Sequence, residues 1–331
     1  MNDIAITLLF ADGVTHQLRA RAGEKLTDAA AQAGLTLLTD CATGQCGTCA
    51  AQRVSGSVSM DDYDSSVLPD DDRDSGAILC CVSRIKEPCI IELPYDASEA
   101  SASETPAQQG RVIALEHVAE DTMRLEVNIE SPLYFLPGQY VRLRPQGQTQ
   151  SRSYSMANAP GQTRLVFYIR IVAGGMFSRW LQTATAGATI EVSAPRGSFF
   201  LREDARPRLF VAGGTGLAPF LAMLRAMDTA ATSNQVPTRL LVGVRSGRHL
   251  FAEDEIAQLK SRLPKLDVEY AAEADAAGSC HTGYATDLIH GGMCPTTRIY
   301  LCGPPPMVEA GRAAASRAGI RKSDILCERF A

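Results

Sequence analysis

Three cysteines lie within nine residues near the amino end of the chain, at Cys41, Cys46 and Cys49. They are spaced C-x4-C-x2-C, and two further cysteines, Cys80 and Cys81, follow in the segment ILCCVSRI. Four thiolates ligate a plant-type [2Fe–2S] cluster at this spacing. The glycines between the cysteines let the backbone approach a cluster closely. The pattern therefore predicts an iron–sulfur centre, with Cys80 or Cys81 as its fourth ligand.

Two other uses of clustered cysteines fit this spacing less well. A structural zinc site typically shows two C-x2-C pairs, and a thioredoxin-like dithiol needs C-x-x-C at the start of a helix in a βαβ pattern. An iron–sulfur centre is therefore favoured. The alternative from another class is a zinc-stabilised binding module fused to a nucleotide-binding domain.

A second group of residues has the chemistry to hold a dinucleotide with a flat ring. In the segment RSYS (152–155), Arg152 offers a planar charged fork for pyrophosphate and Tyr154 an aromatic face. The segment GGMFS (174–178) reads as a glycine turn that opens a helix, whose free amides form an anion site. Together they indicate a pyrophosphate held from two sides.

A third group follows a buried strand candidate. The segment AGGTG (212–216) comes after the apolar run RLFV and before a helical pattern, which is typical of a phosphate-binding turn although it is not the full G-x-G-x-x-G fingerprint. Further on, Arg245 and Arg248 stand where an acidic residue would favour the ribose hydroxyls of NADH. Such arginines can bind a 2′-phosphate, so these residues leave NADPH as an alternative coenzyme to NADH.

Residues 1–97 must position the cysteines. Apolar and polar residues alternate in the segments IAITLLF and THQLRA, which lie on either side of the turn Asp12-Gly13. The segment LTDAAAQAG is predicted to be a helix that ends at Gly34. This ββαβ start with a cysteine loop predicts a ferredoxin-like β-grasp domain. Seven aspartates lie between positions 61 and 74. They form a solvated loop and helix start or, as the alternative, an acidic docking face for a redox partner.

Residues 98–109 are rich in Ala and Ser without apolar periodicity and are predicted to be a linker. From 110 to 205, six short strand candidates separated by Gly and Pro predict a small antiparallel β-barrel. From 206 to 331, strands and helices alternate, which predicts a Rossmann-like parallel sheet with helices on both faces. The expected fold class is thus multidomain, α+β and α/β.

Composition excludes several classes of function. The chain has 331 residues with a net charge of −5 and no Lys/Arg-rich stretch, so a nucleic-acid partner is not expected. No apolar window approaches the roughly 18 residues that span a bilayer, and the amino end does not read as a signal peptide. The ten cysteines fit a local metal site in a reducing compartment, so we expect a cytoplasmic protein without membrane attachment.

Taken together, these residues resemble the ferredoxin–NAD(P) reductase superfamily fused to a plant-type ferredoxin, in the form of the reductase components of benzoate and anthranilate 1,2-dioxygenases. The resemblance covers essentially the whole chain. Its points of match are the cysteine cluster with Cys81, RSYS, the turn at Gly175 and Ser178, PRGSF, AGGTGLAPF, YLCGPPPMVEA and the terminal Glu328-Arg329-Phe330.

The resemblance implies roles for individual residues. It implies that the cluster ligands are Cys41, Cys46, Cys49 and Cys81. It implies that FAD is bound by Arg152, Tyr154, Ser155, Gly175, Met176, Ser178 and Phe330. It implies that the nicotinamide dinucleotide is bound by Gly213, Gly214, Thr215, Gly216, Gly303 and Pro304, with Met307 capping the pocket. Ser155, Cys302 and Glu328 would be the catalytic residues. For Cys302 and Phe330, simple core packing is the alternative.

The implied activity is that of an NADH-dependent flavin and iron–sulfur oxidoreductase. NADH supplies a two-electron hydride, whereas the cluster takes one electron at a time, and FAD bridges the two. The implied partner is the Rieske centre of a separate terminal oxygenase in aromatic hydrocarbon catabolism, and the chain is expected to be a monomer. Reductases that serve a cytochrome P450 or a diiron monooxygenase are the alternative within the redox class.

Overall fold

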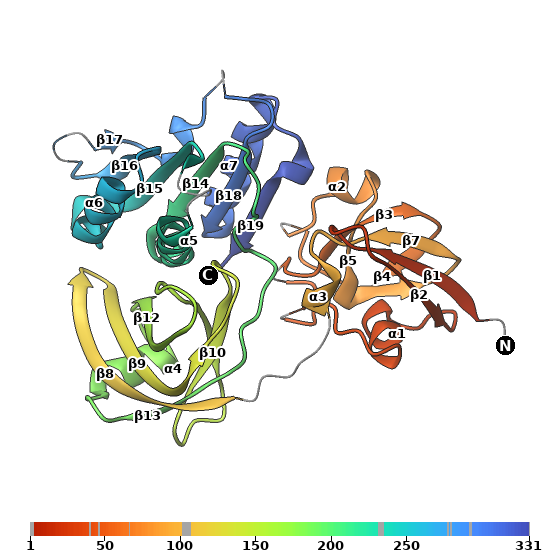
Figure 1. The fold of residues 1–331 in the computed structure, drawn as a ribbon, viewed down its shortest axis with the longest axis horizontal. Helices are drawn as coiled ribbons and strands as arrows, with labels where there is room; N and C mark the ends of the chain where they lie inside the picture. Colours follow the sequence, from red (N-terminus) through yellow and green to blue (C-terminus); the bar gives the residue numbers. More distant parts are fainter. Residues whose placement is uncertain are drawn as a thin grey trace. The chain divides into compact units, whose positions relative to one another are not determined.

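The computed structural model describes residues 3–39, 41–45, 47–65, 67–100, 107–230, 235–276, 278, 280–290 and 293–330. The chain forms two compact units. One comprises Met1–Glu104 with Arg196–Ser198, and the other comprises Thr105–Pro195 with Phe199–Ala331 (Figure 1). The two units are described in turn.

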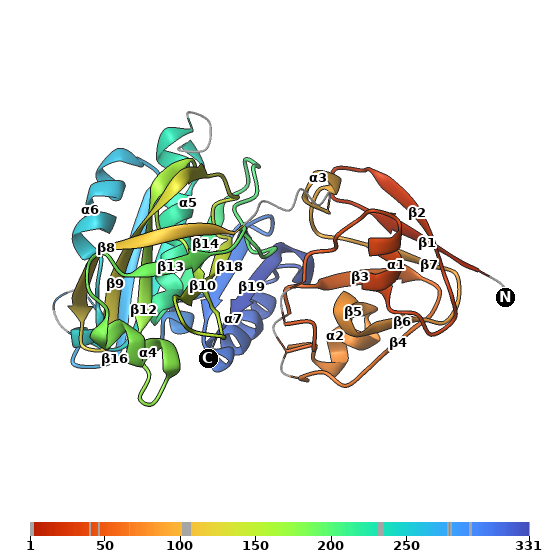
Figure 2. The ribbon, with the colours of Figure 1, turned by 90° about the horizontal axis from the view of Figure 1, so that it is seen from below.

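The first unit is built on a mixed five-stranded sheet of order β2-β1-β7-β3-β5 (Figure 2). β1 pairs with β7 in parallel, and the other neighbours are antiparallel. A two-stranded sheet joins β4 to β6. The elements are β1 (Ile4–Leu9), β2 (Thr15–Ala20), α1 (Leu26–Gln32), β3 (Ala50–Ser55), β4 (Val58–Met60), α2 (Asp70–Asp74), β5 (Ala77–Leu79), the 3-10 turn η1 (Cys80–Val82), β6 (Ser83–Ile85), β7 (Cys89–Glu92) and α3 (Ala97–Ala100).

The predicted ββαβ start is confirmed. In β1, Ile6 and Leu8 are fully buried while the residues between them are not, as expected for a strand with one face on the core. The helix α1 turns Leu26, Ala29 and Ala30 inward and contacts β2. It ends before Gly34, which has the positive φ of a helix-terminating glycine. The first unit is therefore the β-grasp fold expected around the cysteine loop.

The aspartate-rich stretch forms a loop and the short helix α2. Its charges are partly balanced by neighbours: Arg73 pairs with Asp70 and Asp74, and Arg84 pairs with Asp61 at 2.7 Å. Local ion pairs and a helix start account for these described aspartates. The alternative docking role stays a prediction.

Both ends of the segment expected to be a linker belong to secondary-structure elements. Residues Ala97–Ala100 form α3, and Ala100 is fully buried, with its carbonyl accepting a 2.8 Å hydrogen bond from the Thr36 amide. At the other end, β8 already begins at Gln108. Small alanines read as linker composition in the sequence, but they also fit against a core where larger side chains would not. Residues 101–106 lie outside the described residues.

The second unit opens with a six-stranded antiparallel sheet of order β11-β10-β13-β8-β9-β12, the barrel-like FAD-binding fold that the sequence predicts. Every strand candidate between 110 and 205 is found. The elements are β8 (Gln108–Ala119), β9 (Thr122–Leu133), β10 (Tyr140–Pro145), β11 (Arg152–Ser155), β12 (Gln162–Arg170), α4 (Met176–Thr183) and β13 (Thr189–Val192). The inward side chains of these strands form one buried cluster with Phe177 and Leu181 of α4.

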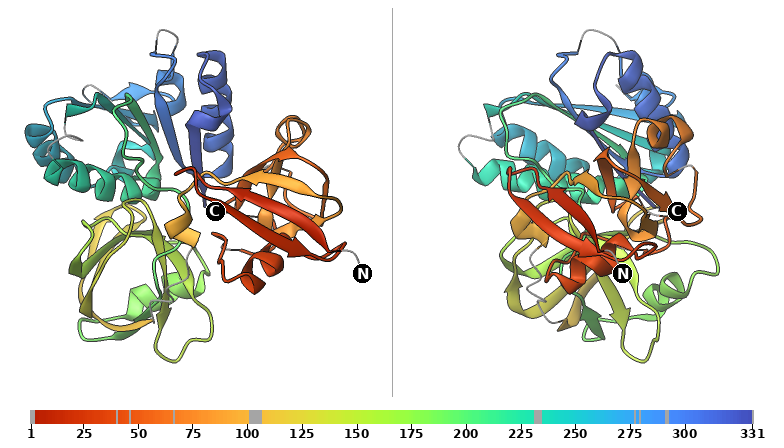
Figure 3. Two further views of the ribbon diagram at one scale, coloured as in Figure 1. Left: turned by 45° about the vertical axis from the view of Figure 1, so that its right-hand side comes forward. Right: turned by 90° about the vertical axis from the view of Figure 1, so that its right-hand side faces the viewer.

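The rest of this unit is a parallel sheet of order β17-β16-β15-β14-β18-β19 (Figure 3). Its strands are β14 (Arg208–Gly213), β15 (Thr238–Ser246), β16 (Leu266–Ala274), β17 (His281–Thr282), β18 (Arg298–Gly303) and β19 (Ile325–Arg329). Its helices are α5 (Leu217–Thr229), α6 (Glu253–Arg262) and α7 (Pro305–Arg317), with 3-10 turns η2 (Gly214–Gly216), η4 (Gly247–His249), η5 (Ala285–Leu288) and η6 (Lys322–Asp324). The alternating pattern of the sequence predicted this arrangement.

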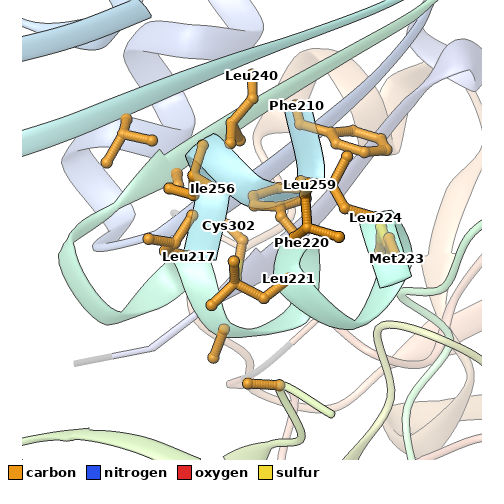
Figure 4. Packing of buried hydrophobic residues seen from close by; sticks show 14 of the residues in the cluster. Phe210, Leu217, Phe220, Leu221, Met223, Leu224, Leu240, Ile256, Leu259 and Cys302 are labelled. Carbon is orange, nitrogen blue, oxygen red and sulfur yellow. The ribbon is translucent and has the colours of Figure 1, made fainter. Parts of the chain in front are cut away.

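Both faces of the parallel sheet are covered, which explains why its strands read as continuous apolar runs. In β14, Phe210 and Ala212 pack with α5 and α6, whereas Leu209 and Val211 pack with α7 on the other face. Figure 4 shows the first of these clusters, with Phe210 beside residues of α5. The rings of Phe210 and Phe220 stack at 5.0 Å.

The barrel and the parallel sheet share a core. Tyr168 of β12 lies in the same buried cluster as α5 and α6, and these helices lie between the sheet and the barrel strands (Figure 1). The Tyr168 hydroxyl donates a 2.6 Å hydrogen bond to Glu255 of α6, whose other oxygen accepts from Arg225 of α5. Arg225 also donates to the carbonyl of Ala157 in the barrel. These contacts fix the two halves of this unit together.

We expect Phe210→Ala to lower the unfolding free energy of the second unit by about 3–5 kcal/mol, because it leaves a cavity in a fully buried cluster. Tyr134→Ala is the control, since its side chain is 77% exposed and its loss should change stability by only about 0.5 kcal/mol. Urea unfolding followed by circular dichroism measures both. Equal unfolding midpoints for the two variants would contradict this packing.

Candidate functional site

The cysteine loop carries amides that point at sulfur. The Sγ of Cys41 accepts hydrogen bonds from the amides of Thr43 at 3.4 Å and Gln45 at 3.2 Å. The backbone takes positive φ values at Ala42 and Gly44, which turns these successive amides inward. N–H groups directed at thiolates stabilise their negative charge and tune a bound cluster.

The loop has room only for glycine at position 44. A Cβ placed there would lie 2.5 Å from the Cβ of Tyr63, and φ is +73°. Because position 44 is glycine, the backbone of the cysteine loop can pack directly against Tyr63 and approach the sulfur atoms closely. The donor set and the tight backbone both fit an iron–sulfur cluster.

The structure separates the two neighbouring cysteines that the sequence left open. They lie in the 3-10 turn η1, where consecutive side chains point in different directions. Burial raises the pKa of the Cys80 thiol to about 12, and this residue packs in the core. Hydrogen bonding to Cys49 and to the backbone of Gly44 instead lowers the pKa of Cys81 to about 6. Cys81 is thus the cysteine that contacts the loop, through Cys49, Cys41 and the backbone of Gly44.

Cys49 completes the described part of this set. Its Sγ accepts a 3.4 Å hydrogen bond from the Cys81 amide, and the hydrogen bond with Cys81 together with burial raises its pKa. Cys46 lies outside the described residues. Within the described residues, no three His, Cys, Asp or Glu side chains are grouped as a metal site. The structure therefore brings Cys41, Cys49 and Cys81 to one loop but does not display a complete ligand set.

The second unit places the predicted flavin residues on β11 and α4. Tyr154 is half-buried, its ring lies 4.8 Å from that of Phe177, and burial raises the pKa of its phenol. Arg152 is exposed on the same strand, and its guanidinium donates to Ser151 and Gln150. An exposed arginine next to an aromatic face suits a ligand that joins a phosphate to a flat ring.

The turn before α4 is a ready anion site. Gly175 is the N-cap, Met176 begins the helix, and the Ser178 hydroxyl accepts a 2.9 Å hydrogen bond from the Val172 amide. A Cβ on Gly175 would lie 3.1 Å from the Val172 carbonyl, so a side chain would fit in this turn only if the neighbouring backbone moved by a few tenths of an ångström. The free amides at the start of this eight-residue helix fit a pyrophosphate.

The glycine turn after β14 packs directly on the end of β18. A Cβ on Gly216 would lie 2.2 Å from the Cys302 carbonyl oxygen, and one on Gly213 would lie 2.6 Å from the Met307 sulfur. Met307 also lies against Gly303, where a Cβ would be 2.9 Å from its Cε. Gly214 has φ +54°, and Thr215 completes η2 before α5 begins. Backbone amides and a helix start are thereby left at the edge of the sheet, which fits a dinucleotide phosphate.

Three residues that are far apart in the sequence meet at one carboxylate. Ser155 Oγ donates a 3.1 Å hydrogen bond to Oε2 of Glu328, and the Cys302 Sγ lies 3.7 Å from the same oxygen. Cys302 is fully buried, and burial together with Glu328 raises its pKa well above the ordinary value. The structure thus brings together the three residues that the resemblance implied as catalytic.

Two predicted residues lie beside this group. The Phe330 amide donates a 3.3 Å hydrogen bond to the Gly303 carbonyl, and its half-buried side chain packs against the cluster around α5. Pro304 is the N-cap of α7, so the chain leaves Gly303 in an extended conformation and turns at once into a helix. Both positions border the end of β18.

Arg245 at the end of β15 and Arg248 in η4 are paired, which the sequence did not predict. Arg245 lies 3.0 Å from Asp121, and Arg248 lies 3.6 Å from Glu120. Both carboxylates come from the turn between β8 and β9. No local signal marks them, because the pairing joins residues 124 positions apart.

Comparison with known proteins agrees with each region. Residues 9–86 match the 2Fe-2S iron-sulfur cluster binding domain, residues 109–201 match the oxidoreductase FAD-binding domain, and residues 210–313 match the oxidoreductase NAD-binding domain. The electron transfer component of toluate 1,2-dioxygenase from Pseudomonas putida is 34% identical over 97% of both chains. That of anthranilate 1,2-dioxygenase from Acinetobacter baylyi is 32% identical over 98% of this chain and 97% of that one.

The chain belongs to the electron transfer components of multicomponent oxygenases. Another relative in this family is the reductase component of propane 2-monooxygenase from Mycolicibacterium goodii, 31% identical over 95% of this chain and 94% of that one. Among solved structures, a cytochrome P450 reductase from Amycolatopsis is 27% identical over 98% of both chains, with a TM-score of 0.72.

Family membership settles the cofactor classes of this electron transfer component. The reductase has domains for a [2Fe–2S] cluster, FAD and NAD, and it is an oxidoreductase. The match to a 2Fe-2S cluster binding domain supports an iron–sulfur cluster and not the zinc-stabilised module that was the alternative. No described helix is long and apolar enough to cross a membrane.

We expect the Cys302 thiol of this reductase to resist iodoacetamide near neutral pH, because it is enclosed and its raised pKa keeps it protonated. Cys294 should react first, since it is exposed and a hydrogen bond with Thr296 lowers its pKa. Peptide mapping by mass spectrometry after timed alkylation of the native protein compares the two. Equal labelling rates would show that Cys302 is accessible.

Proposed function

We propose that this reductase oxidises NADH and delivers single electrons to the Rieske centre of a terminal dioxygenase that acts on an aromatic acid. The observation that carries the proposal is the full-length likeness to the toluate and anthranilate 1,2-dioxygenase components, together with the meeting of Ser155, Cys302 and Glu328 at the end of the parallel sheet. In this scheme FAD, when bound, converts a two-electron hydride into two single-electron transfers.

The proposed roles follow from where each residue lies. The amides before α4, with Ser178 and Arg152, would hold the FAD pyrophosphate, and Tyr154 would pack against the flavin ring. The Gly213–Gly216 turn would hold the dinucleotide phosphates at the start of α5. Both sites use free backbone amides rather than lysine charge, which suits a chain of net negative charge.

Glu328 would keep the reacting region ordered and dry. Its carboxylate accepts from Ser155, which fixes the hydroxyl, and the buried Cys302 closes the space next to it. A protonated thiol and a hydroxyl held by one carboxylate can orient a nicotinamide ring and exclude water around it. Phe330, packed beside Gly303, would shield the same region.

Cys41, Cys46, Cys49 and Cys81 would ligate the cluster. Amides already directed at the Cys41 and Cys49 sulfurs support two of these ligands, and the lowered pKa of Cys81 supports a third. Cys80, protonated and buried, would remain a packing residue.

The matched pair Cys81→Ala and Cys80→Ala tests this assignment. Cys81→Ala should lose cluster iron and reduction of cytochrome c by NADH while keeping ferricyanide reduction, because the flavin half lies in the other unit. Cys80→Ala should keep both activities and lose only about 1–2 kcal/mol of stability. Iron analysis and the two reduction assays show whether Cys81 or Cys80 is the fourth cluster ligand. Retention of iron in the Cys81 variant would refute the ligand set.

The oxygenase partner is tested by reconstitution. The purified reductase should support NADH-dependent dihydroxylation of an aromatic acid by a Rieske dioxygenase, measured as product formed per NADH consumed. A cytochrome P450 and a diiron monooxygenase are the comparison arms, since a P450 reductase and the propane 2-monooxygenase reductase share this architecture. Coupled turnover only with one of those partners would overturn the Rieske assignment.

We also propose that the reductase works as a cytoplasmic monomer. The ten cysteines include a cluster with metal-ligand spacing instead of evenly spread pairs, which suits a reducing compartment. A monomer leaves the cluster-bearing unit free to meet a separate oxygenase.

A further inference from the structure

The carboxyl end of β15 lies where a bound dinucleotide would present its adenosine ribose. Gly243 of β15 pairs with Gly213 of β14, so Arg245, the second-last residue of β15, lies at the same edge as the glycine turn. In open parallel sheets a dinucleotide binds at this edge, and in the dinucleotide-binding fingerprint a residue about 20 positions after the glycine turn, or an arginine nearby, meets the ribose 2′ group. Arg245 comes 29 positions after Gly216, at the end of the neighbouring strand, so it lies at the edge where such a residue distinguishes a 2′-hydroxyl from a 2′-phosphate.

Asp121 already holds this arginine. Its Oδ2 lies 3.0 Å from Nη2 of Arg245 and 3.2 Å from Nε of Arg170. The same Nη2 is 2.8 Å from the Nε2 of His249. The aspartate side chain is 23% exposed, compared with 59% for Arg245, so the carboxylate sits beneath the guanidinium. The barrel thus supplies a counter-charge to the coenzyme edge of the sheet.

The turn that carries Asp121 is fixed against this edge. The Glu120 amide donates a 3.1 Å hydrogen bond to the Arg248 carbonyl, and Asp121 accepts from Thr122 through its other oxygen. The Asp121 carbonyl accepts a 2.7 Å hydrogen bond from the Ile171 amide. These backbone contacts hold the carboxylate in place, so its position does not depend on the ion pair alone.

The charges around this edge balance. We call the ribose-end cluster the set of three arginines and three carboxylates that pair here: Arg170, Arg245, Arg248, Glu120, Asp121 and Asp275. Three positive and three negative side chains leave no net charge. A 2′-phosphate carries up to two negative charges and needs an uncompensated guanidinium fork, whereas a ribose hydroxyl does not.

We propose that Asp121 is a specificity-determining residue, which rejects NADPH by occupying the guanidinium of Arg245. The inference rests on the proposed NADH oxidation and names the residue that selects this coenzyme. Without the Asp121 charge, Arg245 is free to pair with a 2′-phosphate at the same place.

The test compares Asp121→Asn with wild type by two independent measurements. The first is kcat/KM for ferricyanide reduction by NADPH and by NADH, on the purified holoprotein. The second is the Kd of adenosine 2′-monophosphate by isothermal titration calorimetry, with adenosine 5′-monophosphate as reference. In Asp121→Asn, the NADPH-to-NADH ratio of kcat/KM should rise about tenfold and the Kd for the 2′-phosphate should fall about tenfold.

Two further variants separate the pairing from a general change of charge. Glu130→Gln removes one exposed carboxylate of β9 in the same barrel and should leave both measurements at wild-type values. In the double variant Asp121→Asn with Arg245→Ala, the gain for NADPH should disappear, because the phosphate then has no freed guanidinium.

Three results would overturn the proposal. They are a wild-type preference for NADPH, an unchanged 2′-phosphate affinity in a folded Asp121→Asn protein, or a gain that persists without Arg245. Failure of the proposed function gives a different outcome, since neither coenzyme would then reduce the holoprotein. The calorimetric comparison still decides the role of Asp121 in that case, because it needs no turnover.

Discussion

The close approach of the Gly213–Gly216 turn to the end of β18 is the contact on which the coenzyme half of this reductase depends. A single Cβ at Gly216 would lie 2.2 Å from the Cys302 carbonyl, so a side chain there would push β14 and β18 apart. With glycine, α5 begins directly over the edge of the sheet and offers its free amides there. At the same end of the sheet, the pairing of β18 with β19 sets Cys302 against Glu328.

The two units differ in the sequence separation of the residues that build their sites. In the first unit the contacts are local: amides two and four residues further along the loop point at the Cys41 sulfur, and a 3-10 turn decides which of two adjacent cysteines faces the loop. In the second, the site is assembled from remote segments that meet only because the barrel and the sheet share a core around α5 and α6. The carboxylates Glu328, Glu255 and Asp121 link these segments.

Much of this arrangement could be predicted because its causes are local. Alternation around Asp12-Gly13 gave the first hairpin, and continuous apolar runs gave the buried parallel strands. The linker was harder, because alanines at 97 and 100 that pack in a core have the composition of a flexible segment. The pairing of Arg245 was missed altogether, since its carboxylate belongs to a turn in another fold element.

The sequence by itself determined the order of the three regions, the spacing of the cysteines and the two glycine turns that each precede a helix. Each of these depends on neighbours along the chain, which short-range patterns record. Only the tertiary structure decided that Cys81 contacts the cysteine loop, that Ser155 reaches Glu328 across 173 residues, and that Asp121 holds Arg245. Those contacts depend on how distant segments pack, and no local preference of a residue encodes the identity of its distant partner.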